Sequence, residues 1–228
     1  MRQVTKQRWD EAQDYEKKYW RKMYSSREVR LKKNYELIKC QLLEHIKLNK
    51  NSKILEVGCG PEHIIHYWKD GKTYAIDPLI NYFKKIGIMK KGKVRLSNGV
   101  GESLPYKNNF FDIILIINVL DHCQNPEKVL SEIKRCLKKN GAIYLRVSVR
   151  PNYLLPILKI MWKTKILVTK GHPFLFTEKN IAHLLKNGGF YIKKSWLNKD
   201  KFKFKFLFNL KELFQFITEY QYICICKI

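Results

Sequence analysis

Two glycines and a carboxylate, each at the end of an apolar segment, are the residues best placed to bind a ligand. Residues 54–57, Ile-Leu-Glu-Val, are predicted to form a short strand that ends in Gly58-Cys59-Gly60. Glycines at i and i+2 permit a tight turn and let the backbone approach a ligand without an intervening side chain. A second apolar segment, 73–76, ends in Asp77, whose carboxylate can accept hydrogen bonds from both hydroxyls of a ribose. Together these positions predict a site for an adenosine-containing cofactor.

The segments around these positions alternate between strand and helix patterns. Short apolar runs bounded by polar residues predict strands at 54–57, 73–76, 94–96, 112–117 and 142–149. Helices are predicted at about 62–70, 79–86 and 126–139, the last of them stopped by Asn140-Gly141. Strands alternating with helices indicate a parallel sheet with helices on both faces. In such a sheet, ligands bind beyond the carboxyl ends of the strands, where Gly58, Gly60 and Asp77 are expected.

Further elements are predicted on both sides of this core. Residues 5–24 and 27–48 have helical patterns, and the second has an apolar stripe made of Leu31, Tyr35, Ile38, Leu42 and Ile46. The stripe predicts that this N-terminal part packs onto the sheet, and the aromatic residues of the first helix suit a cap over a bound ligand. After the core, Thr177 can cap a helix that runs to about Asn187, followed by strands at 190–197 and 220–227.

Several motifs, in order along about 51–149, resemble the class I S-adenosylmethionine (SAM)-dependent methyltransferases, of the type 11-like domain. Residues 54–61, Ile-Leu-Glu-Val-Gly-Cys-Gly-Pro, are similar to that family's first motif. Residues 101–106 and then 110–112 resemble its adenine-side loop and the lead into its fourth strand. Residues 118–122, Asn-Val-Leu-Asp-His, followed by 126–141, resemble the segment after that strand and the next helix.

The resemblance implies a fold and a set of cofactor-binding residues. The fold is α/β, a Rossmann-like doubly wound sheet of seven strands with an antiparallel last strand and helices on both faces, here with an N-terminal helical cap. The glycine turn would pass the amino-acid part of SAM, Asp77 would hold the ribose, and Asn118 would close the methionine end. The implied cofactor-binding residues are Glu56, Gly58, Cys59, Gly60, Asp77, Pro78, Glu102, Ser103 and Asn118, with Glu102 and Ser103 near the adenine.

Position 62 departs from the family pattern, and position 63 bears on the alternative cofactor. Glu62 stands where the family often has a third glycine; it would be favourable at a helix N-terminus and could contact the cofactor's ammonium or repel its carboxylate. A nicotinamide dinucleotide would instead require G-x-G-x-x-G, with a glycine at position 63, which is His63. Because Glu56 before the turn is typical of the methyltransferases, SAM is the favoured cofactor.

His122 and Asp121 are the candidate catalytic residues. Methyl transfer from a sulfonium is an in-line displacement, so the protein mainly aligns the acceptor and excludes water. A hydroxyl acceptor additionally needs a base, and His122 lies just past the fourth predicted strand with an ordinary pKa of about 6.5. Asp121 and His172 are further candidates for the base, and the alternative for His122 is a structural residue that caps the following loop.

Cysteine and histidine spacing predicts no metal site. None of the six cysteines forms a C-x-x-C pair. His63 and His66 lie three residues apart and can share a helix face, but no third ligand accompanies them in the sequence.

The charge balance, 45 basic against 20 acidic residues, raises the question of a nucleic-acid partner. The basic excess is spread along the whole chain and is mostly lysine, whereas arginine is the usual choice for forked phosphate and base contacts. A solvated lysine-rich surface is therefore favoured over a nucleic-acid footprint. An RNA methyltransferase and a catalytically silent SAM-binding protein remain the alternatives.

Two C-terminal segments bear on the acceptor. Residues 152–168 are apolar and lie where relatives of this type often insert an acceptor lid, with core packing as the alternative. Residues 201–206 alternate lysine and phenylalanine, a pattern that suits an edge strand guarded by lysines, a single-stranded nucleic acid or a membrane surface. The favoured acceptor is a small or amphiphilic metabolite of glycan or lipid type, methylated on oxygen or nitrogen.

The chain is predicted to be one methyltransferase domain over 1–228. Its parts are a helical cap (1–50), a SAM-binding core (51–150), an acceptor-lid insertion (151–176) and a C-terminal helix with strands (177–228). No apolar run approaches the roughly 20 residues that span a bilayer, and the N-terminus is charged. A cytoplasmic location is therefore expected, with peripheral contact at the inner membrane surface as an option.

Overall fold

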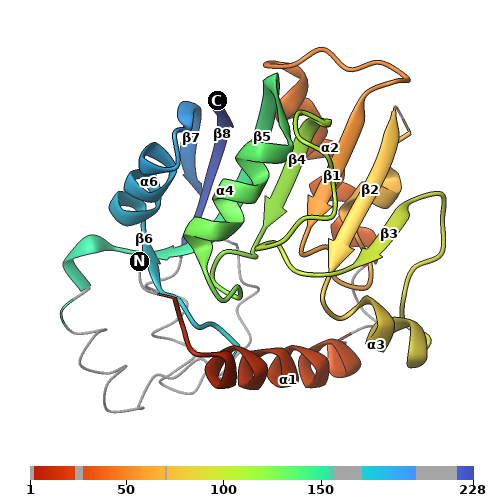
Figure 1. The fold of residues 1–228 in the computed structure, drawn as a ribbon, viewed down its shortest axis with the longest axis vertical. Helices are drawn as coiled ribbons and strands as arrows, with labels where there is room; N and C mark the ends of the chain where they lie inside the picture. The colour runs from red at the N-terminus through yellow and green to blue at the C-terminus, as the bar shows by residue number, and fades with distance from the viewer. Residues whose placement is uncertain (1–2, 24–27, 70, 155, 157–170, 199–219) are drawn as a thin grey trace.

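A computed structural model describes residues 3–23, 28–69, 71–154, 156, 171–198 and 220–228. Its centre is an eight-stranded sheet with the order β3-β2-β1-β4-β5-β8-β7, and β6 pairs with β5 (Figure 1). The strands are β1 Lys53–Val57, β2 Lys72–Asp77, β3 Arg95–Asn98, β4 Phe111–Ile117, β5 Leu137–Arg150, β6 Phe176–Thr177, β7 Tyr191–Asn198 and β8 Tyr220–Lys227.

The strand directions confirm the predicted doubly wound fold. Strands β1 to β5 pair in parallel, and β8 runs antiparallel to both β5 and β7. The chain proceeds from β1 outward to β2 and β3, and then returns to the other side of β1 for β4 and β5. The strand order therefore reverses between β1 and β4, which is where such sheets bind ligands. The short strand β6 was not predicted.

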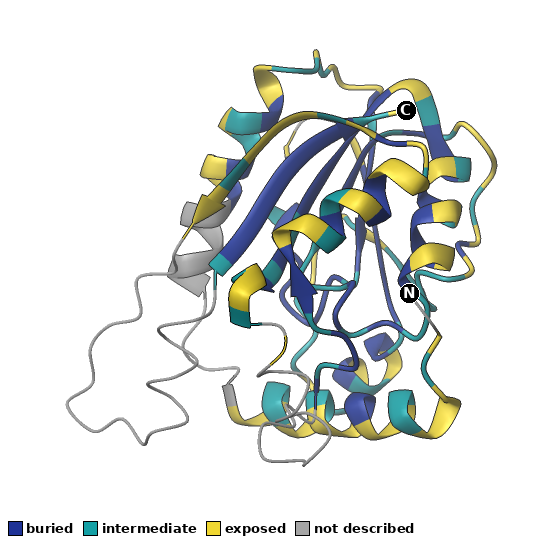
Figure 2. Ribbon diagram, turned by 90° about the vertical axis from the view of Figure 1, so that its left-hand side faces the viewer, coloured by how far each residue is buried: buried dark blue, intermediate teal, exposed yellow. Residues whose placement is uncertain are grey.

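Helices cover both faces of the sheet because the central strands are apolar on both sides. In β4, Ile114 and Ile116 belong to a core shared with α4 (Pro126–Cys136) and α6 (Glu178–Asn187). The alternate residues Ile113 and Leu115 face a second core, which contains Tyr35, Ile38 and Leu42 of α2 (Glu28–Leu43). This two-sided burial explains the uninterrupted apolar run in β4. Figure 2 shows the buried strands at the centre and the exposed outer faces of the helices.

Helix α1 (Lys6–Met23) lies across the carboxyl ends of the strands instead of on a face of the sheet (Figure 1). At one end, Trp20 packs edge-on against Phe83 of α3 (Ile80–Lys85), with ring centroids 6.1 Å apart. At the other end, Arg8 Nη2 donates to the carbonyl oxygen of His172 at 3.4 Å. The helix is thus held on both sides of the edge where a ligand is expected.

The predicted helix at 62–70 is only a short 3-10 turn, η2 (Ile64–Tyr67). The backbone N–H groups of Ile64 and Ile65 donate to the buried Glu56 carboxylate at 3.2 and 2.9 Å. These N–H groups bond to Glu56 in β1. A longer helix would instead need backbone hydrogen bonds between residues i and i−4.

Helix α4 ends at Cys136, so the predicted stop at Asn140-Gly141 is wrong. The last carbonyl groups of the helix accept hydrogen bonds from residues 109–110. Asn109 N donates to Arg135 O at 3.0 Å, and Phe110 N donates to Cys136 O at 2.8 Å. Leu137 then pairs with Phe111 and opens β5. Pairing with β4 outcompetes the helical propensity of 137–139.

Of the predicted acceptor lid at 152–168, only residues 152–154 and 156 are described, and 152–154 form the 3-10 turn η3 (Asn152–Leu154). The Lys/Phe stretch at 201–206 lies outside the described residues. Among the helices that the structure describes, none is long and apolar enough to cross a bilayer.

Candidate active site

The turn after β1 requires glycine at two positions. Gly58 and Gly60 have φ angles of 65° and 61°, in the left-handed region that other residues adopt at a cost. The Gly58 and Cys59 N–H groups donate to Ile76 O in β2, at 2.8 and 3.2 Å. A Cβ on Gly58 would also lie 2.4 Å from Val119 Cγ2. The backbone of Gly58, which has no side chain, therefore packs directly against the segment that follows β4.

Asp77 closes this turn from the end of β2. Its Oδ2 accepts from Gly60 N at 2.9 Å, and its Oδ1 accepts from Leu79 N at 2.8 Å. Burial raises the pKa of Asp77 to about 6, although these two N–H groups favour the ionised form. A carboxylate offers about four acceptor positions. Two remain for ligand donors such as the hydroxyls of a ribose.

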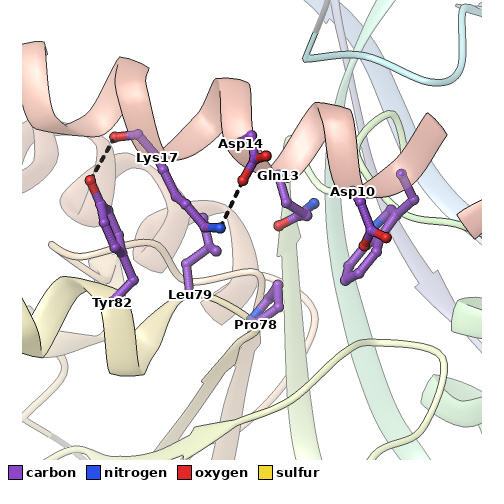
Figure 3. Close-up of a pocket in the computed structure, with 8 residues that line it drawn as sticks. Asp10, Gln13, Asp14, Lys17, Pro78, Leu79 and Tyr82 are labelled. Carbon is purple, nitrogen blue, oxygen red and sulfur yellow. Dashed lines mark hydrogen bonds and ion pairs between the residues drawn. The ribbon is translucent and has the colours of Figure 1, made fainter. Parts of the chain in front are cut away.

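A cavity of about 370 Å³ adjoins Asp77, between α1 and the start of α3 (Figure 3). Pro78 and Leu79 form its floor, and the aromatic rings of Trp9 and Tyr82 contribute apolar surface. The remaining lining residues are polar and come from α1: Asp10, Gln13, Asp14 and Lys17. Tyr82 Oη donates to Lys17 O at 3.4 Å, so the helix and α3 are joined beside the cavity.

Two of the predicted cofactor ligands have carboxylates already engaged with the backbone. Glu56 binds the N–H groups of η2, as described above, and burial raises its pKa to about 8. Glu102 Oε1 accepts from Gln124 N and Asn125 N at 2.7 and 3.0 Å. The first bond set holds the segment after the glycine turn, and the second holds the segment before α4. Both carboxylates therefore already accept hydrogen bonds from backbone N–H groups of the protein.

The remaining predicted cofactor residues differ in exposure. Cys59 is buried, donates to Gly60 O at 3.3 Å, and has a thiol pKa raised well above its usual range by burial. Ser103 is exposed. Asn118 has a positive φ of 54°, its N–H donates to Arg146 O at 2.8 Å, and its buried Oδ1 has no hydrogen-bond partner among the described residues. A buried acceptor of this kind suits a donating group of a ligand, such as an ammonium.

Asp121, His122 and His172 come together beyond β4 and form the polar cluster of the site. His172 Nδ1 lies 2.8 Å from Asp121 Oδ2, and His122 Nε2 lies 3.9 Å from the same oxygen. The two imidazole centroids are 4.2 Å apart. Burial raises the pKa of Asp121, but His122 and the hydrogen bond with His172 outweigh it and hold the pKa at about 2. Asp121 is therefore ionised at neutral pH.

Glu16 of α1 joins this cluster to Asp77. Its Oε1 lies 3.5 Å from His122 Nδ1. Glu16 and His122 both lie close enough to influence the pKa of Asp77, which Glu16 raises and His122 lowers. Asp77 and the polar cluster therefore lie near one another at the same edge of the sheet.

The sequence did not single out Glu16, and it offered His172 only as a further candidate for the base. Phe174 N donates to Asp121 O at 3.3 Å, which draws the segment 171–174 alongside the end of β4. A Cβ on Gly171 would lie 2.8 Å from Tyr15 and 2.9 Å from Glu16 Oε1, so α1 packs closely on this glycine. The motif Gly171-His172-Pro173 was the available signal for His172, whereas no local pattern marked Glu16.

Comparison with known proteins gives a match to the family described as a methyltransferase domain, over residues 55–145. An uncharacterized protein of Methanocaldococcus jannaschii is 29% identical over 180 residues, which cover 78% of each chain. A second uncharacterized protein of that organism is 36% identical over 106 residues, which cover 46% of this chain and 45% of that protein. Among solved structures, a putative methyltransferase from Bacillus halodurans superimposes with a TM-score of 0.62 at 19% identity, covering 82% of this chain and 95% of that one.

The matched region begins in β1 and ends in β5, and so includes the glycine turn, Asp77 and the segment after β4. The sheet positions those same elements at one edge. Residues 55–145 therefore have the sequence of a methyltransferase domain, on a sheet whose fold resembles that of the solved methyltransferase structure.

Proposed function

We propose that the chain is a class I SAM-dependent methyltransferase that acts on a small or amphiphilic acceptor of glycan or lipid type, held beneath α1, and methylates an oxygen or nitrogen. The observation that carries the proposal is the cluster of Asp121, His122 and His172 beside α1. His172 Nδ1 lies 2.8 Å from Asp121 Oδ2, and His122 lies 3.5 Å from Glu16 of α1 and 3.9 Å from Asp121. Cofactor binding and proton removal are therefore combined in one site.

In this proposal the chain binds SAM through backbone and a few polar atoms. The Gly58–Gly60 turn receives the amino-acid part, Asp77 accepts from the ribose hydroxyls, and Asn118 Oδ1 accepts from the ammonium group. Glu56 and Glu102 support the site indirectly, because their carboxylates hold the loops on either side of it. Cys59 packs within the turn, while Pro78 and Ser103 border the adenine side. When bound, SAM supplies a methyl group already activated as a sulfonium.

The polar cluster can take up the proton that the acceptor loses on methylation. An acceptor lone pair forms the bond to the methyl carbon, the carbon–sulfur bond breaks, and its electron pair stays on sulfur, which leaves S-adenosylhomocysteine. Ionised Asp121 favours the His172 tautomer with hydrogen on Nδ1, because that N–H then donates to Oδ2. The lone pair of this tautomer is on Nε2, where it can accept the proton. Asp121 acts in this scheme as a positioning residue and not as the base.

Charge and enclosure both favour a small acceptor over RNA. Although the chain has a net charge of +25, the site gathers three carboxylates, Glu16, Asp77 and Asp121. A phosphate backbone entering this edge would meet repulsion. Helix α1 also covers the edge from Phe83 to His172, so an acceptor has to fit beneath a helix. RNA remains the alternative acceptor class.

Methyl-labelled SAM incubated with fractionated cell extract tests the acceptor class. We expect label in the small-molecule or lipid fraction, and none with Asp77→Ala at the same SAM concentration. Label in the RNA fraction would overturn the acceptor assignment. Binding of S-adenosylhomocysteine without label in any fraction would favour the silent binding protein instead.

The affinity for S-adenosylhomocysteine should fall as the pH falls from 7 to 5. Burial raises the pKa of Asp77 to about 6, and ribose hydroxyls donate to an ionised carboxylate more strongly than to a protonated one. For one group with this pKa, linkage predicts about tenfold weaker binding at pH 5. Calorimetry at both pH values measures the change.

Asp77→Asn provides the control, because it removes the Asp77 charge and leaves Glu16 and His122 in place. The variant should bind about 1–3 kcal/mol more weakly at pH 7 and lose most of the pH dependence. A wild-type affinity that is equal at pH 5 and 7 would remove Asp77 from the ribose site.

A further inference from the structure

The Asp121, His122 and His172 cluster has the composition and spacing of a metal site. Within the described part of the chain it is the one group of three or more histidine, cysteine or carboxylate side chains whose ligand atoms lie within 4.8 Å of one another. This is contrary to the expectation from sequence that the histidines would not gather, because His172 is distant from the other two along the chain. Two imidazoles and a carboxylate are a common ligand set for divalent first-row metals.

The distances suit a shared ion. Two atoms each about 2.1 Å from one ion lie about 3.0 Å apart at a right angle and about 3.4 Å apart at a tetrahedral angle. The two nitrogen-to-Asp121 Oδ2 distances, 2.8 Å from His172 and 3.9 Å from His122, lie on either side of this range. All three ligand atoms lie within 4.8 Å of one another, so side-chain adjustment would bring them to one ion.

Both ring nitrogens of His122 have a place in such a site. Nε2 faces Asp121, while Nδ1 is buried and faces Glu16 Oε1 at 3.5 Å. His122 Nδ1 makes no hydrogen bond with the described residues, so Glu16 acts on it through charge at this distance. The nearby carboxylate favours hydrogen on Nδ1, which leaves the lone pair of Nε2 toward the ion.

Asp121 supplies an independent sign that a ligand is missing from its surroundings. The residue is only 2% exposed, and its Oδ1 has no hydrogen-bond partner among the described residues. A buried carboxylate oxygen without a donor costs free energy unless a cation or donor meets it. The charges of Asp121 and Glu16 together would balance a divalent ion.

We propose that Asp121, His122 and His172 bind one divalent first-row transition-metal ion, with Glu16 orienting the His122 ring from α1. Metal binding stands on the cluster alone. Its consequence for the acceptor rests on the proposed function: three protein ligands leave coordination positions open, and an acceptor oxygen bound there would have a lowered pKa. In the metal-bound form His172 would be a ligand through Nδ1 and would no longer serve as the base, so the acceptor's proton would pass to solvent.

Titration of the full chain with Co²⁺, after removal of metal by a chelator, tests the site directly. We expect one ion bound per chain, visible in the absorption of Co²⁺, displaced by Zn²⁺ and unaffected by Mg²⁺, which prefers oxygen ligands. His172→Ala should weaken Co²⁺ binding at least about 100-fold and Glu16→Gln about tenfold. Because Cys40 is exposed, the series is made in a Cys40→Ser background to exclude thiolate binding.

His183→Ala is the matched control, since His183 is an exposed histidine on α6 outside the cluster, and it should leave the Co²⁺ affinity unchanged. Affinity for S-adenosylhomocysteine and the melting temperature show that each variant is folded. Absence of Co²⁺ binding, or equal binding by His172→Ala, would overturn the metal site. Co²⁺ binding by a chain that transfers no label would keep the metal site and refute the proposed function. Methyl transfer that persists after chelation, in a chain that does not bind Co²⁺, would refute the metal site and keep the proposed function.

Discussion

Replacing Asp121 with asparagine should slow methyl transfer by a factor of about 10² to 10⁴, the range for losing a positioned proton acceptor. The amide keeps the size of the side chain but removes the charge that holds the His172 Nδ1–H at 2.8 Å. It would also remove a negative ligand if the cluster binds metal. Affinity for S-adenosylhomocysteine should change by less than about twofold, because Asp121 lies beyond the cofactor ligands. The measurements are the initial rate of label transfer into the accepting fraction at saturating SAM, and calorimetry.

Asp112→Asn is the matched control for this experiment. Asp112 is also a β4-associated aspartate, but it lies at the amino end of the strand, where it accepts from Lys53 N at 2.8 Å and Lys138 Nζ at 2.7 Å. Its loss should lower the melting temperature without changing the transfer rate at saturation. If Asp121→Asn retained a third of the wild-type rate, or lost cofactor affinity to the same degree as activity, its assigned role would be wrong.

Gly58→Ala should destabilise the protein by about 3 kcal/mol, from a left-handed backbone cost of about 1–2 kcal/mol and an overpacking cost of about 1–3 kcal/mol. The new Cβ would lie 2.4 Å from Val119 Cγ2, so the glycine turn and the segment after β4 would have to separate. For a chain of this length, the melting temperature should fall by about 10 °C. Because both sides of the cofactor site move, S-adenosylhomocysteine binding should also weaken.

Gly87→Ala separates the cost of the left-handed backbone from the cost of overpacking. Gly87 has a φ of 74° but no atom within 4 Å of a Cβ, so it should show only the backbone cost of about 1–2 kcal/mol. Adding Val119→Ala to Gly58→Ala should recover part of the lost stability by removing the clashing methyl groups. Equal melting temperatures for Gly58→Ala and Gly87→Ala would show that contact with Val119 does not constrain the turn.

The local sequence was sufficient where one pattern dominated each segment. The apolar run at 112–117 predicted a buried parallel strand, and Thr177 predicted a helix start that the structure shows as a capping box with Asn180. Gly58 and Gly60 predicted a tight turn, and in the structure both have positive φ angles. In each case the requirement lies within a few residues, so neighbours in sequence determine it.

Tertiary contacts decided the rest of the fold and most of the site's chemistry. Residues 137–139 have a helical pattern, yet pairing with Phe111 makes them the start of β5. The carboxylates of Glu56 and Glu102 could not be assigned to loop support from sequence, because the N–H groups that they accept from lie 8 to 23 residues away. The meeting of Glu16, Asp121, His122 and His172 depends on α1 crossing the sheet edge and on Phe174 pairing with Asp121. Residue types and local periodicity specify the strands and turns, whereas the approach of distant charged groups is set by packing that no local pattern records.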